Sequence, residues 1–249
     1  QYDGSEANSV EMPTLGAKNG LTLASMIGKS FDDPEWDTLL DQLTYSEMVQ
    51  TITLGFHNTA AAASIGKTAT KDENGPQGLT AALTGGASAM CYTSEDVMAA
   101  TFNVDLINEV GRCIGEDCLA MGYSGLYGPG INMHRTAYSG RNFEYYAEDP
   151  FVAGTICAAE VQGIQSKGVY VYLKHVALND SETSRRGVNT WLNEQTAREI
   201  YLEVADKAIT DGGAWDVMTG FNRWGATWCG ANANLLTGFL RGELGMRGM

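Results

Sequence analysis

Histidine and positive charge are scarce in this sequence of 249 residues, and each scarcity excludes a class of function. The three histidines, His57, His134 and His175, lie far apart in the chain and do not have the spacing of a metal cluster. Sixteen Lys and Arg stand against thirty Asp and Glu, which leaves a formal net charge of -14. From the histidine spacing we expect no metal ion. Because phosphate backbones and anionic membrane surfaces would repel an acidic chain, we also expect no nucleic-acid partner.

Long apolar runs and cofactor motifs are also missing. No apolar run approaches the ~20 residues that a membrane helix needs, so we expect no membrane segment in this chain. The sequence has no Gly-x-Gly-x-x-Gly stretch opening a helix, no Walker loop and no His-Glu-x-x-His pair. The five cysteines include no CxxC pair, which favours buried free thiols over a metal site. The chain begins at Gln1 without an apolar leader, and we expect a cytoplasmic location, with a secreted or cell-surface location as the alternatives.

What the sequence does contain is an alternation of helical and strand patterns. With 44% hydrophobic and 18% charged residues, the chain can bury a real core. Residues 1–30 lack periodicity and are interpreted as an arm or the tail of a preceding domain, followed by one domain over residues 31–249. The predicted helices cover residues 34–54, 103–122, 149–168 and 193–213. The predicted buried strands cover residues 125–127, 169–173 and 216–218, whereas residues 59–86 are interpreted as loop around the turn at Gly75-Pro76.

Strands that alternate with helices of this length indicate parallel βα units. The fold class is therefore α/β. In a (β/α)8 barrel the functional side chains follow the strands, at the C-terminal face.

Two groups of polar residues follow predicted strands. The loop after residues 125–127 carries Arg135, Arg141 and Glu144, and an Arg fork suits sugar hydroxyls or a carboxylate, although structural ion pairing would explain the same residues. Lys174 and His175 stand directly after the apolar run 169–173, where two cations are costly unless they are paired or functional. The alternative is a core histidine beside an exposed lysine.

Further polar and aromatic residues follow in the chain. The run from Asn179 to Arg186 would either orient Lys174 and His175 or form a solvated loop. Phe221 and Trp224 come after the third predicted strand, where aromatic rings can stack on a sugar face, with core packing as the ordinary alternative.

Taken together, these motifs resemble glycoside hydrolase family 3 of the β-glucosidase type, from about Asp33 to Met249. The family's GPx(V/I)N(I/M)xR, GRNFE and (S/A)EDP stretches correspond to GPGINMHR, GRNFEYY and AEDP here. Its Lys-His pair with a downstream NxxExxR pattern corresponds to KHVALNDSETSRR. The MxxYN-type loop and the LLTxxLRxExG(F/M)xG ending correspond to residues 218–222 and 235–248.

The resemblance implies a (β/α)8 TIM-barrel-type domain that is incomplete at its C-terminal end. It implies that Arg141, Lys174 and His175 bind hydroxyls of the nonreducing-end sugar. It also implies that the nucleophilic Asp falls just after Met249 and that the acid/base belongs to another domain, so no catalytic carboxylate is expected within this chain. No metal or organic cofactor is implied.

Two positions depart from the family pattern. The family's sugar-binding Asp of the Asp-Gly-Pro loop aligns with Asn74, which is neutral and can both donate and accept hydrogen bonds. Asp72 or Glu73 would substitute for it if the loop shifts. The Tyr that usually neighbours the nucleophile aligns with Phe221, which lacks the hydroxyl.

The intact protein is therefore expected to be a retaining, exo-acting β-glycosidase, with this chain supplying the sugar-binding wall. Its expected partners are a carbohydrate substrate and the rest of its own polypeptide, including a second domain, and a homo-oligomer is left open. The alternative is a carbohydrate-binding or regulatory protein on a catalytically decayed hydrolase scaffold, which the substitutions at Asn74 and Phe221 keep open.

Overall fold

The computed structural model describes residues 11–248 and divides the chain into two compact units, residues 1–71 and 72–249. Residues 16, 17 and 21 hydrogen-bond to residues 41–43, so part of the segment 1–30 packs within the first unit. The division of the chain into an arm at 1–30 and a domain at 31–249 stays a prediction.

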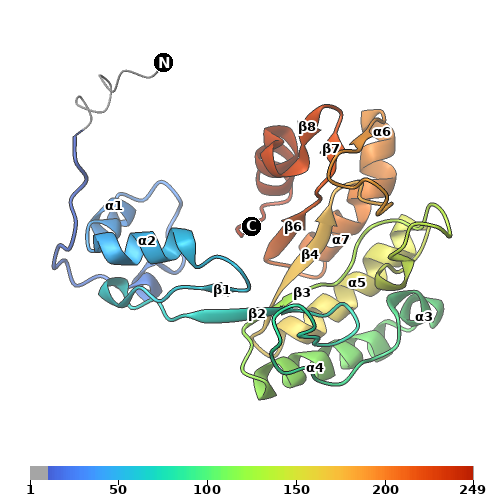
Figure 1. Cartoon of the computed structure of the whole chain (residues 1–249), viewed down its shortest axis with the longest axis horizontal. Coiled ribbons are helices and arrows are strands. Elements are labelled where there is room, and N and C mark those ends of the chain that lie inside the picture. The colour runs from blue at the N-terminus through green and yellow to red at the C-terminus, as the bar shows by residue number, and fades with distance from the viewer. Residues whose placement is uncertain (1–10, 249) are drawn as a thin grey trace. The chain divides into compact units, whose positions relative to one another are not determined.

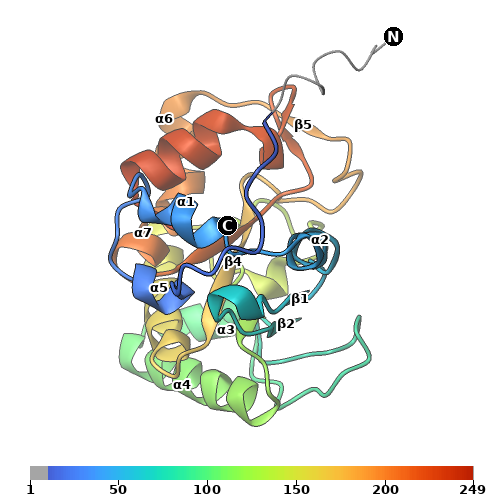
Figure 2. The same ribbon diagram turned by 90° about the vertical axis from the view of Figure 1, so that its left-hand side faces the viewer.

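The first unit is a small helical cluster around four buried residues, Met26, Leu39, Ala62 and Ile65. Its helices are η2 (Leu23–Met26), α1 (Glu35–Leu40), α2 (Tyr45–Thr53) and η3 (Ala63–Ile65). The short strand β1 (Asn58–Thr59) pairs antiparallel with the first residues of β2 (Thr70–Asn74). Figure 2 shows α1 and α2 of this unit.

The single helix predicted over residues 34–54 is wrong, because the chain breaks between α1 and α2. Thr44 caps α2 and forms a capping box with Glu47, which requires extended backbone at Thr44. Glu47 also accepts hydrogen bonds from the backbone and hydroxyl of Ser64. Hydrogen bonds from the backbone of Ser64 and of Thr44 lower the pKa of Glu47 to about 2. The cap therefore ends one helix and starts another where apolar periodicity alone shows no break.

The second unit contains a parallel sheet in chain order, β2-β3-β4-β6 (Figure 1). Its other strands are β3 (Gly125–Tyr127), β4 (Tyr170–Val176) and β6 (Asp216–Thr219), which confirm the three predicted strands. Asp72 to Asn74 of β2 pair with β3, β3 pairs with β4, and β4 pairs with β6.

Strand β2 was not predicted, because its sequence is polar. Asp72 and Glu73 are nevertheless buried. The hydroxyls of Tyr170 and Tyr172 donate to the two carboxylate oxygens of Asp72, at 2.5 and 3.2 Å, and Thr84 donates to Glu73. Satisfied hydrogen bonds therefore allow acidic residues to occupy a buried strand that a hydrophobicity pattern cannot reveal.

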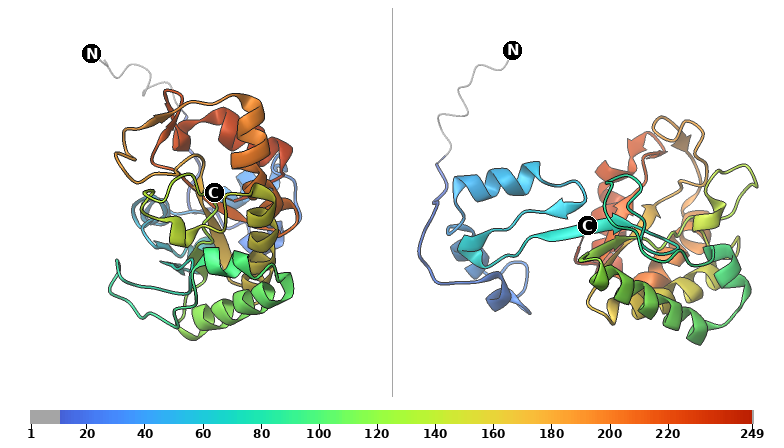
Figure 3. Two further views of the ribbon diagram at one scale, coloured as in Figure 1. Left: turned by 90° about the vertical axis from the view of Figure 1, so that its right-hand side faces the viewer. Right: turned by 60° about the horizontal axis from the view of Figure 1, so that its bottom comes forward.

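Helices lie along the outer side of this sheet. They are α4 (Val104–Ala120), α5 (Pro150–Gln165) and a continuous helical segment made of α6 (Glu194–Thr196), the π-helical η5 (Ala197–Leu202) and α7 (Glu203–Thr210). All three predictions are confirmed, with Asn103, Asp149 and Asn193 accepting the capping hydrogen bonds. Figures 1 and 3 show α5 between α4 and α7, in agreement with their packing.

Glycines allow α4 and α5 to approach closely. A Cβ atom added to Gly163 would lie 2.8 Å from the backbone nitrogen of Arg112 and 3.0 Å from the carbonyl carbon of Gly111. Val161 and Ile164 of α5 and Ile107 and Ile114 of α4 belong to the main core, which also includes Val171 and Leu173 of β4. Alternate β4 side chains thus face the helices, which leaves Tyr170, Tyr172 and Lys174 on the opposite face.

This arrangement is part of a (β/α)8 TIM-barrel-type domain, in which parallel strands on the inside alternate with helices on the outside. The second unit also contains the short helices α3 (Glu95–Ala100) and η4 (Asn142–Glu144), which were not predicted. A further small sheet consists of β5 (Asn189–Thr190), β7 (Arg223–Trp224) and β8 (Thr227–Trp228). Helices η6 (Cys229–Ala231) and η7 (Asn234–Glu243) follow it.

All five cysteines are free thiols. The prediction of burial is confirmed for Cys118, Cys157 and Cys229 and is wrong for Cys91 and Cys113, which are exposed. Within residues 11–248 no helix combines the length and the apolar character needed to cross a bilayer. The same residues contain no group of three or more His, Cys, Asp and Glu side chains arranged to hold a metal ion.

Candidate functional site

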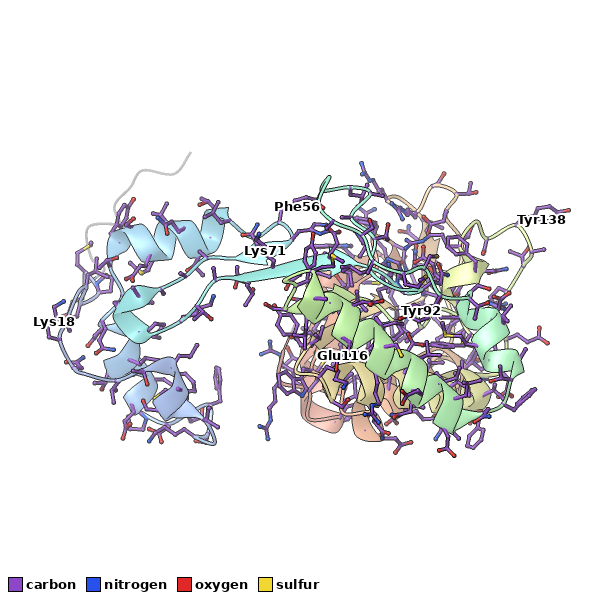
Figure 4. The ribbon with its side chains drawn as sticks, turned by 90° about the horizontal axis from the view of Figure 1, so that it is seen from below. Lys18, Phe56, Lys71, Tyr92, Glu116 and Tyr138 are labelled. Atoms are coloured by element: carbon purple, nitrogen blue, oxygen red, sulfur yellow. The ribbon has the colours of Figure 1, made fainter. Side chains whose placement is uncertain are left out.

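The predicted site residues lie at the carboxyl ends of the parallel strands or in the loops that follow them. Asn74 is the last residue of β2, Lys174 and His175 lie near the end of β4, and Phe221 is two residues beyond β6. Arg141 lies in the loop after β3, directly before η4. Tyr138, from the same loop, is exposed and marks its outer end in Figure 4.

Glu144 joins the two cationic side chains of the site. Arg141 forms a forked pair with it, from Nε to Oε1 at 3.1 Å and from Nη2 to Oε2 at 2.7 Å. Lys174 Nζ lies 3.1 Å from the same Oε2 atom, and the lysine side chain is only 4% exposed. The carboxylate therefore holds one guanidinium and one ammonium group together at the ends of β3 and β4. Because both cations are largely shielded from solvent, their position requires a structural or a functional reason.

Charge pairing sets the protonation states of this triad. Burial acts to raise the pKa of Glu144, but hydrogen bonds and charges from Arg141 and Lys174 outweigh it and hold this pKa below its usual value. Burial lowers the pKa of Lys174, and Glu144 opposes that effect. A carboxylate between two cations is the arrangement in which all three groups remain charged at neutral pH.

His175 is neutral and its tautomer is fixed by Asn132. The side chain of Asn132 donates to the carbonyl oxygen of His175 at 3.1 Å, and its Oδ1 accepts from the His175 backbone N–H at 2.8 Å. The same Oδ1 lies 3.3 Å from Nδ1 of His175, which assigns the ring proton to Nδ1. Nε2 then accepts from Nη1 of Arg141 at 3.2 Å. Burial, followed by the charges of Arg141 and Lys174, lowers the pKa of His175 well below its ordinary value.

A second group of charges connects Arg141 to Phe221. Oε1 of Glu182 lies 3.8 Å from Nη1 of Arg141, and its Oε2 accepts from Arg185 Nη1 at 2.5 Å. The guanidinium carbon of Arg185 lies 4.9 Å from the centroid of the Phe221 ring, which is a cation–π distance. Phe221 remains 45% exposed, so one part of its ring is open to a ligand.

Asn74 lies at the same sheet edge but outside the direct contacts of this cluster. Its side-chain amide donates to Glu73 Oε1 at 3.1 Å, and its backbone carbonyl oxygen accepts from the backbone N–H of Thr80. Strand alternation places Asn74 on the face that carries Asp72, which is hydrogen-bonded to Tyr170 and Tyr172 of β4. Asn74 therefore shares the face of Lys174 and is available to a ligand that spans both strand ends.

The structure thus brings Arg141, Lys174 and His175 into one contact network and connects Phe221 to it through Arg185. One hollow of the second unit lies beside Trp215 at the edge of β6 and another beside Trp224 and Arg198, whereas a narrow space lined by Asn132 and His175 adjoins the cluster. The cluster and not the hollows beside the tryptophans is the candidate site, because buried cations at strand ends require a structural or functional reason.

Several residues of the site were not singled out from the sequence. Glu144, which joins the triad, is named from the sequence only as one acidic residue of its loop, although an Arg and a Glu three residues apart are a usable signal of pairing. Asn132 is part of the GPGINMHR stretch, which gives no sign of its role. Gln77 donates to Glu95 and to the carbonyl oxygen of Phe143, next to Glu144. Neither residue is marked in the sequence, because Gln77 lies in a turn and Glu95 is one of two acidic residues that begin α3.

Parallel strands that alternate with outer helices, with a polar, charged cluster at the strand ends, are the features of a TIM-barrel-type domain that carries a site at its C-terminal face. The chain belongs to glycosyl hydrolase family 3: residues 52–249 match the model of the "Glycosyl hydrolase family 3 N terminal domain".

Known relatives agree with this family. A "Beta-glucosidase" of Rhizobium radiobacter is 34% identical over 86% of this chain and 26% of the relative. An "Exo-alpha-(1->6)-L-arabinopyranosidase" of Bifidobacterium longum is 34% identical over 71% of this chain and 24% of the relative. The structure of β-glucosidase 3B from Thermotoga neapolitana in complex with glucose superimposes with a TM-score of 0.72 and 35% identity, over 77% of this chain and 28% of that one. The chain spans about a quarter of the length of these relatives.

Proposed function

We propose that the protein is a retaining, exo-acting β-glycosidase that hydrolyses a nonreducing-end β-linked sugar. The observation that carries the proposal is the cluster of Arg141, Glu144, Lys174 and His175 at the carboxyl ends of β3 and β4. These side chains present several hydrogen-bond donors and one imidazole nitrogen within a small volume, and neighbouring sugar hydroxyls require both donors and acceptors. The names of the relatives support a pyranoside substrate and leave the particular sugar open.

Each side chain of the cluster has a distinct task in this proposal. Lys174 Nζ has three protons and one carboxylate partner, which leaves donors for sugar oxygens. Arg141 is held by both oxygens of Glu144, so its remaining N–H groups keep a fixed direction. His175 Nε2 accepts from Arg141 and can exchange that partner for a sugar hydroxyl. Phe221, which is 45% exposed and lies within cation–π distance of Arg185 and Arg186, offers the exposed part of its ring to the sugar.

In the retaining route two carboxyl groups about 5 to 5.5 Å apart act as nucleophile and acid/base. The family resemblance assigns both to parts of the protein other than residues 1–249. We therefore propose that this chain binds and orients the sugar, and that a second domain of the same polypeptide completes the site. Tight binding of the nonreducing-end sugar lowers the activation barrier only where the contacts become stronger in the transition state.

The test is turnover of aryl β-glycosides by the protein expressed from its complete gene, with residues 1–249 expressed alone for comparison. For the complete protein we expect hydrolysis with retention at the anomeric carbon. The configuration of the released sugar is measured by NMR. We expect no turnover from residues 1–249, because covalent catalysis needs a carboxylate nucleophile. Inversion at the anomeric carbon, or retaining turnover by residues 1–249 alone, would contradict this proposal.

The second candidate is a carbohydrate-binding or regulatory protein on a decayed hydrolase scaffold. It is favoured by the neutral Asn74 and by Phe221, both of which replace polar groups that the family pattern uses. Binding of a monosaccharide by the complete protein, measured by calorimetry, without hydrolysis of any aryl glycoside tested, would select this candidate.

Asn74→Asp is expected to change the ranking of sugars and not to lower activity uniformly. The amide of Asn74 can donate to one sugar oxygen and accept from one hydroxyl, whereas a carboxylate only accepts, though more strongly. The measurement is kcat/KM on aryl β-glycosides that are epimeric or deoxygenated at single positions, with thermal midpoints alongside.

The matched control is Asn234→Asp, which adds the same charge at an exposed position on η7. We expect the control to leave the ranking unchanged. A uniform loss across the panel together with a large fall in midpoint would show that Asn74 structures the loop, and Asp72 or Glu73 would replace it as the candidate sugar ligand.

A further inference from the structure

Two fully buried glutamates lie behind the site and are not explained by sugar binding. Glu95 belongs to α3 and Glu160 to α5, and both side chains are 0% exposed. Oε2 of Glu95 accepts from Gln77 Nε2 at 3.0 Å, and Oε2 of Glu160 accepts from the hydroxyl of Tyr146 at 2.6 Å. The other oxygen of each carboxyl group has no hydrogen-bond partner among residues 11–248.

Burial favours the protonated form of both glutamates, and the pKa of Glu160 lies at about 7. Burial, followed by the charges of Glu160 and Glu144, raises the pKa of Glu95 well above its usual value. Burial likewise raises the pKa of Glu160. A buried carboxyl group in this state carries a proton and can donate as well as accept, and the helices that bear the two groups, α3 and α5, pack against each other.

Their partners hold the chain on both sides of Glu144. Gln77 Nε2 also donates to the carbonyl oxygen of Phe143 at 2.5 Å, one residue before Glu144. Tyr146, two residues after Glu144, is itself buried and is held by Glu160. The segment 143–146 is therefore fixed at two points, and Glu144 lies between them with its carboxylate directed at Arg141 and Lys174.

Gln77 adds a second connection. It lies three residues after Asn74, in the turn that begins at Gly75-Pro76, and its backbone carbonyl accepts from Tyr92. The same side chain thus links the loop after β2 to the loop after β3 and to Glu95 on α3. Tyr92, labelled in Figure 4, in turn donates to Asp117 of α4 at 3.0 Å.

We propose that Gln77, Glu95, Tyr146 and Glu160 form a positioning network that fixes Glu144 and thereby sets the geometry of the sugar-binding Arg141 and Lys174. The four residues touch neither substrate nor reacting atoms in this proposal. They act through Glu144, since a carboxylate displaced by a fraction of an ångström would carry both cationic groups with it. The inference rests on the proposed function, because it assigns Arg141 and Lys174 to the sugar.

Three variants of the complete protein test the network. Gln77→Leu removes both donated hydrogen bonds at similar volume, and Glu95→Leu removes the acceptor. Glu95→Gln keeps an oxygen that accepts from Gln77 and replaces the protonated oxygen by an NH₂ donor, so it is the conservative variant for a neutral acid. The matched control is Gln165→Leu, which removes a 2.7 Å hydrogen bond from a glutamine of α5 to the carbonyl oxygen of Gly213, away from the site.

Steady-state kinetics on an aryl β-glycoside give the first measurement. We expect Gln77→Leu and Glu95→Leu to raise KM about 10-fold or more, with a smaller fall in kcat, because they loosen groups that bind the sugar. Glu95→Gln is expected to stay within about 2-fold of the unmodified protein, since its hydrogen bonds are conserved. Gln165→Leu is expected to leave KM unchanged, whatever its effect on the thermal midpoint.

Hydrogen exchange of the peptide covering residues 139–148 gives a measurement that does not depend on activity. We expect this peptide to exchange faster in Gln77→Leu and Glu95→Leu than in the unmodified protein. In Glu95→Gln and Gln165→Leu we expect the exchange rate to be unchanged. A complete protein without glycosidase activity would contradict the proposed function. Unchanged KM and unchanged exchange in Gln77→Leu, or equal damage from Glu95→Gln and Glu95→Leu, would overturn the positioning network in an active protein.

Discussion

Lys174→Ala and His175→Ala are each expected to lower kcat/KM. The expected loss of transition-state binding is about 2 to 4 kcal/mol for each, the range for charged hydrogen bonds in a closed site. Lys174 is buried and has Glu144 as its carboxylate partner, so solvent cannot satisfy its remaining hydrogen-bond donors. His175 is held by Asn132 and Arg141, and its loss also frees Nη1 of Arg141. The measurement is steady-state kinetics of the complete protein on an aryl β-glycoside.

Lys207→Ala provides the control for Lys174→Ala. Lys207 also pairs with a carboxylate, at 3.2 Å from Asp211, but it belongs to α7 and lies away from the strand ends. We expect Lys207→Ala to change kcat/KM by less than about 2-fold, because Lys207 packs against α5 and contacts no residue of the cluster. Near-normal kinetics in both Lys174→Ala and His175→Ala would leave these residues with a structural role only.

The parts of the fold that the sequence predicts correctly are those with local signals. Helices α4 and α5 combine an N-capping side chain with a long run of helix-forming residues, and Pro150 stands at the first turn of α5. Strand β2 carries no such signal, because its buried Asp72 is stabilised by tyrosines almost 100 residues away. A hydrogen bond of that sequence separation is a property of the folded chain and cannot be obtained from a local pattern.

The same distinction applies to the site. Lys174 and His175 are visible in the sequence because two polar residues directly follow an apolar run. Their pairing with Arg141 is a tertiary contact, and the sequence alone favours structural ion pairing over ligand binding for the loop that carries Arg141. The structure confirms the ion pair of Arg141 with Glu144, whereas ligand binding by Arg141 stays a prediction.

Glu144→Ala is expected to lower the free energy of unfolding by about 3 to 5 kcal/mol, the cost of leaving buried charges without a partner. Glu144, Arg141 and Lys174 have side chains that are 12%, 18% and 4% exposed, so solvent replaces little of the lost interaction. The measurement is native-state hydrogen exchange of β4 and α5 amides in the complete protein. The control is Glu116→Ala, on α4 in Figure 4, whose side chain is 61% exposed and whose pair with Lys167 is expected to contribute about 0 to 1 kcal/mol.

The contribution of Glu144 is also expected to depend on pH. Its pKa is held below the unfolded value by Arg141 and Lys174. A group with a lowered folded pKa stabilises the protein fully above its unfolded pKa of about 4.3 and loses that contribution as the pH falls through the folded pKa. The unmodified protein and Glu144→Ala should therefore differ most in stability above pH 5 and converge in more acidic solution. A constant difference from pH 7 to below pH 4 would contradict the charge-pairing explanation.

Replacement of the whole triad separates the charge of Glu144 from its volume. If the cost of Glu144→Ala arises from the unpaired cations, then replacing Arg141 and Lys174 by methionine in the Glu144→Leu background should recover most of the lost stability, because a buried ion pair is often no more stable than apolar residues of similar size. Sugar binding should not recover, since the donors are gone. Recovery of stability without recovery of binding would show that the triad is retained for the ligand. A triple variant as unstable as Glu144→Ala would instead contradict unpaired charge as the cause of the loss, because leucine fills the volume of the glutamate and no cation remains.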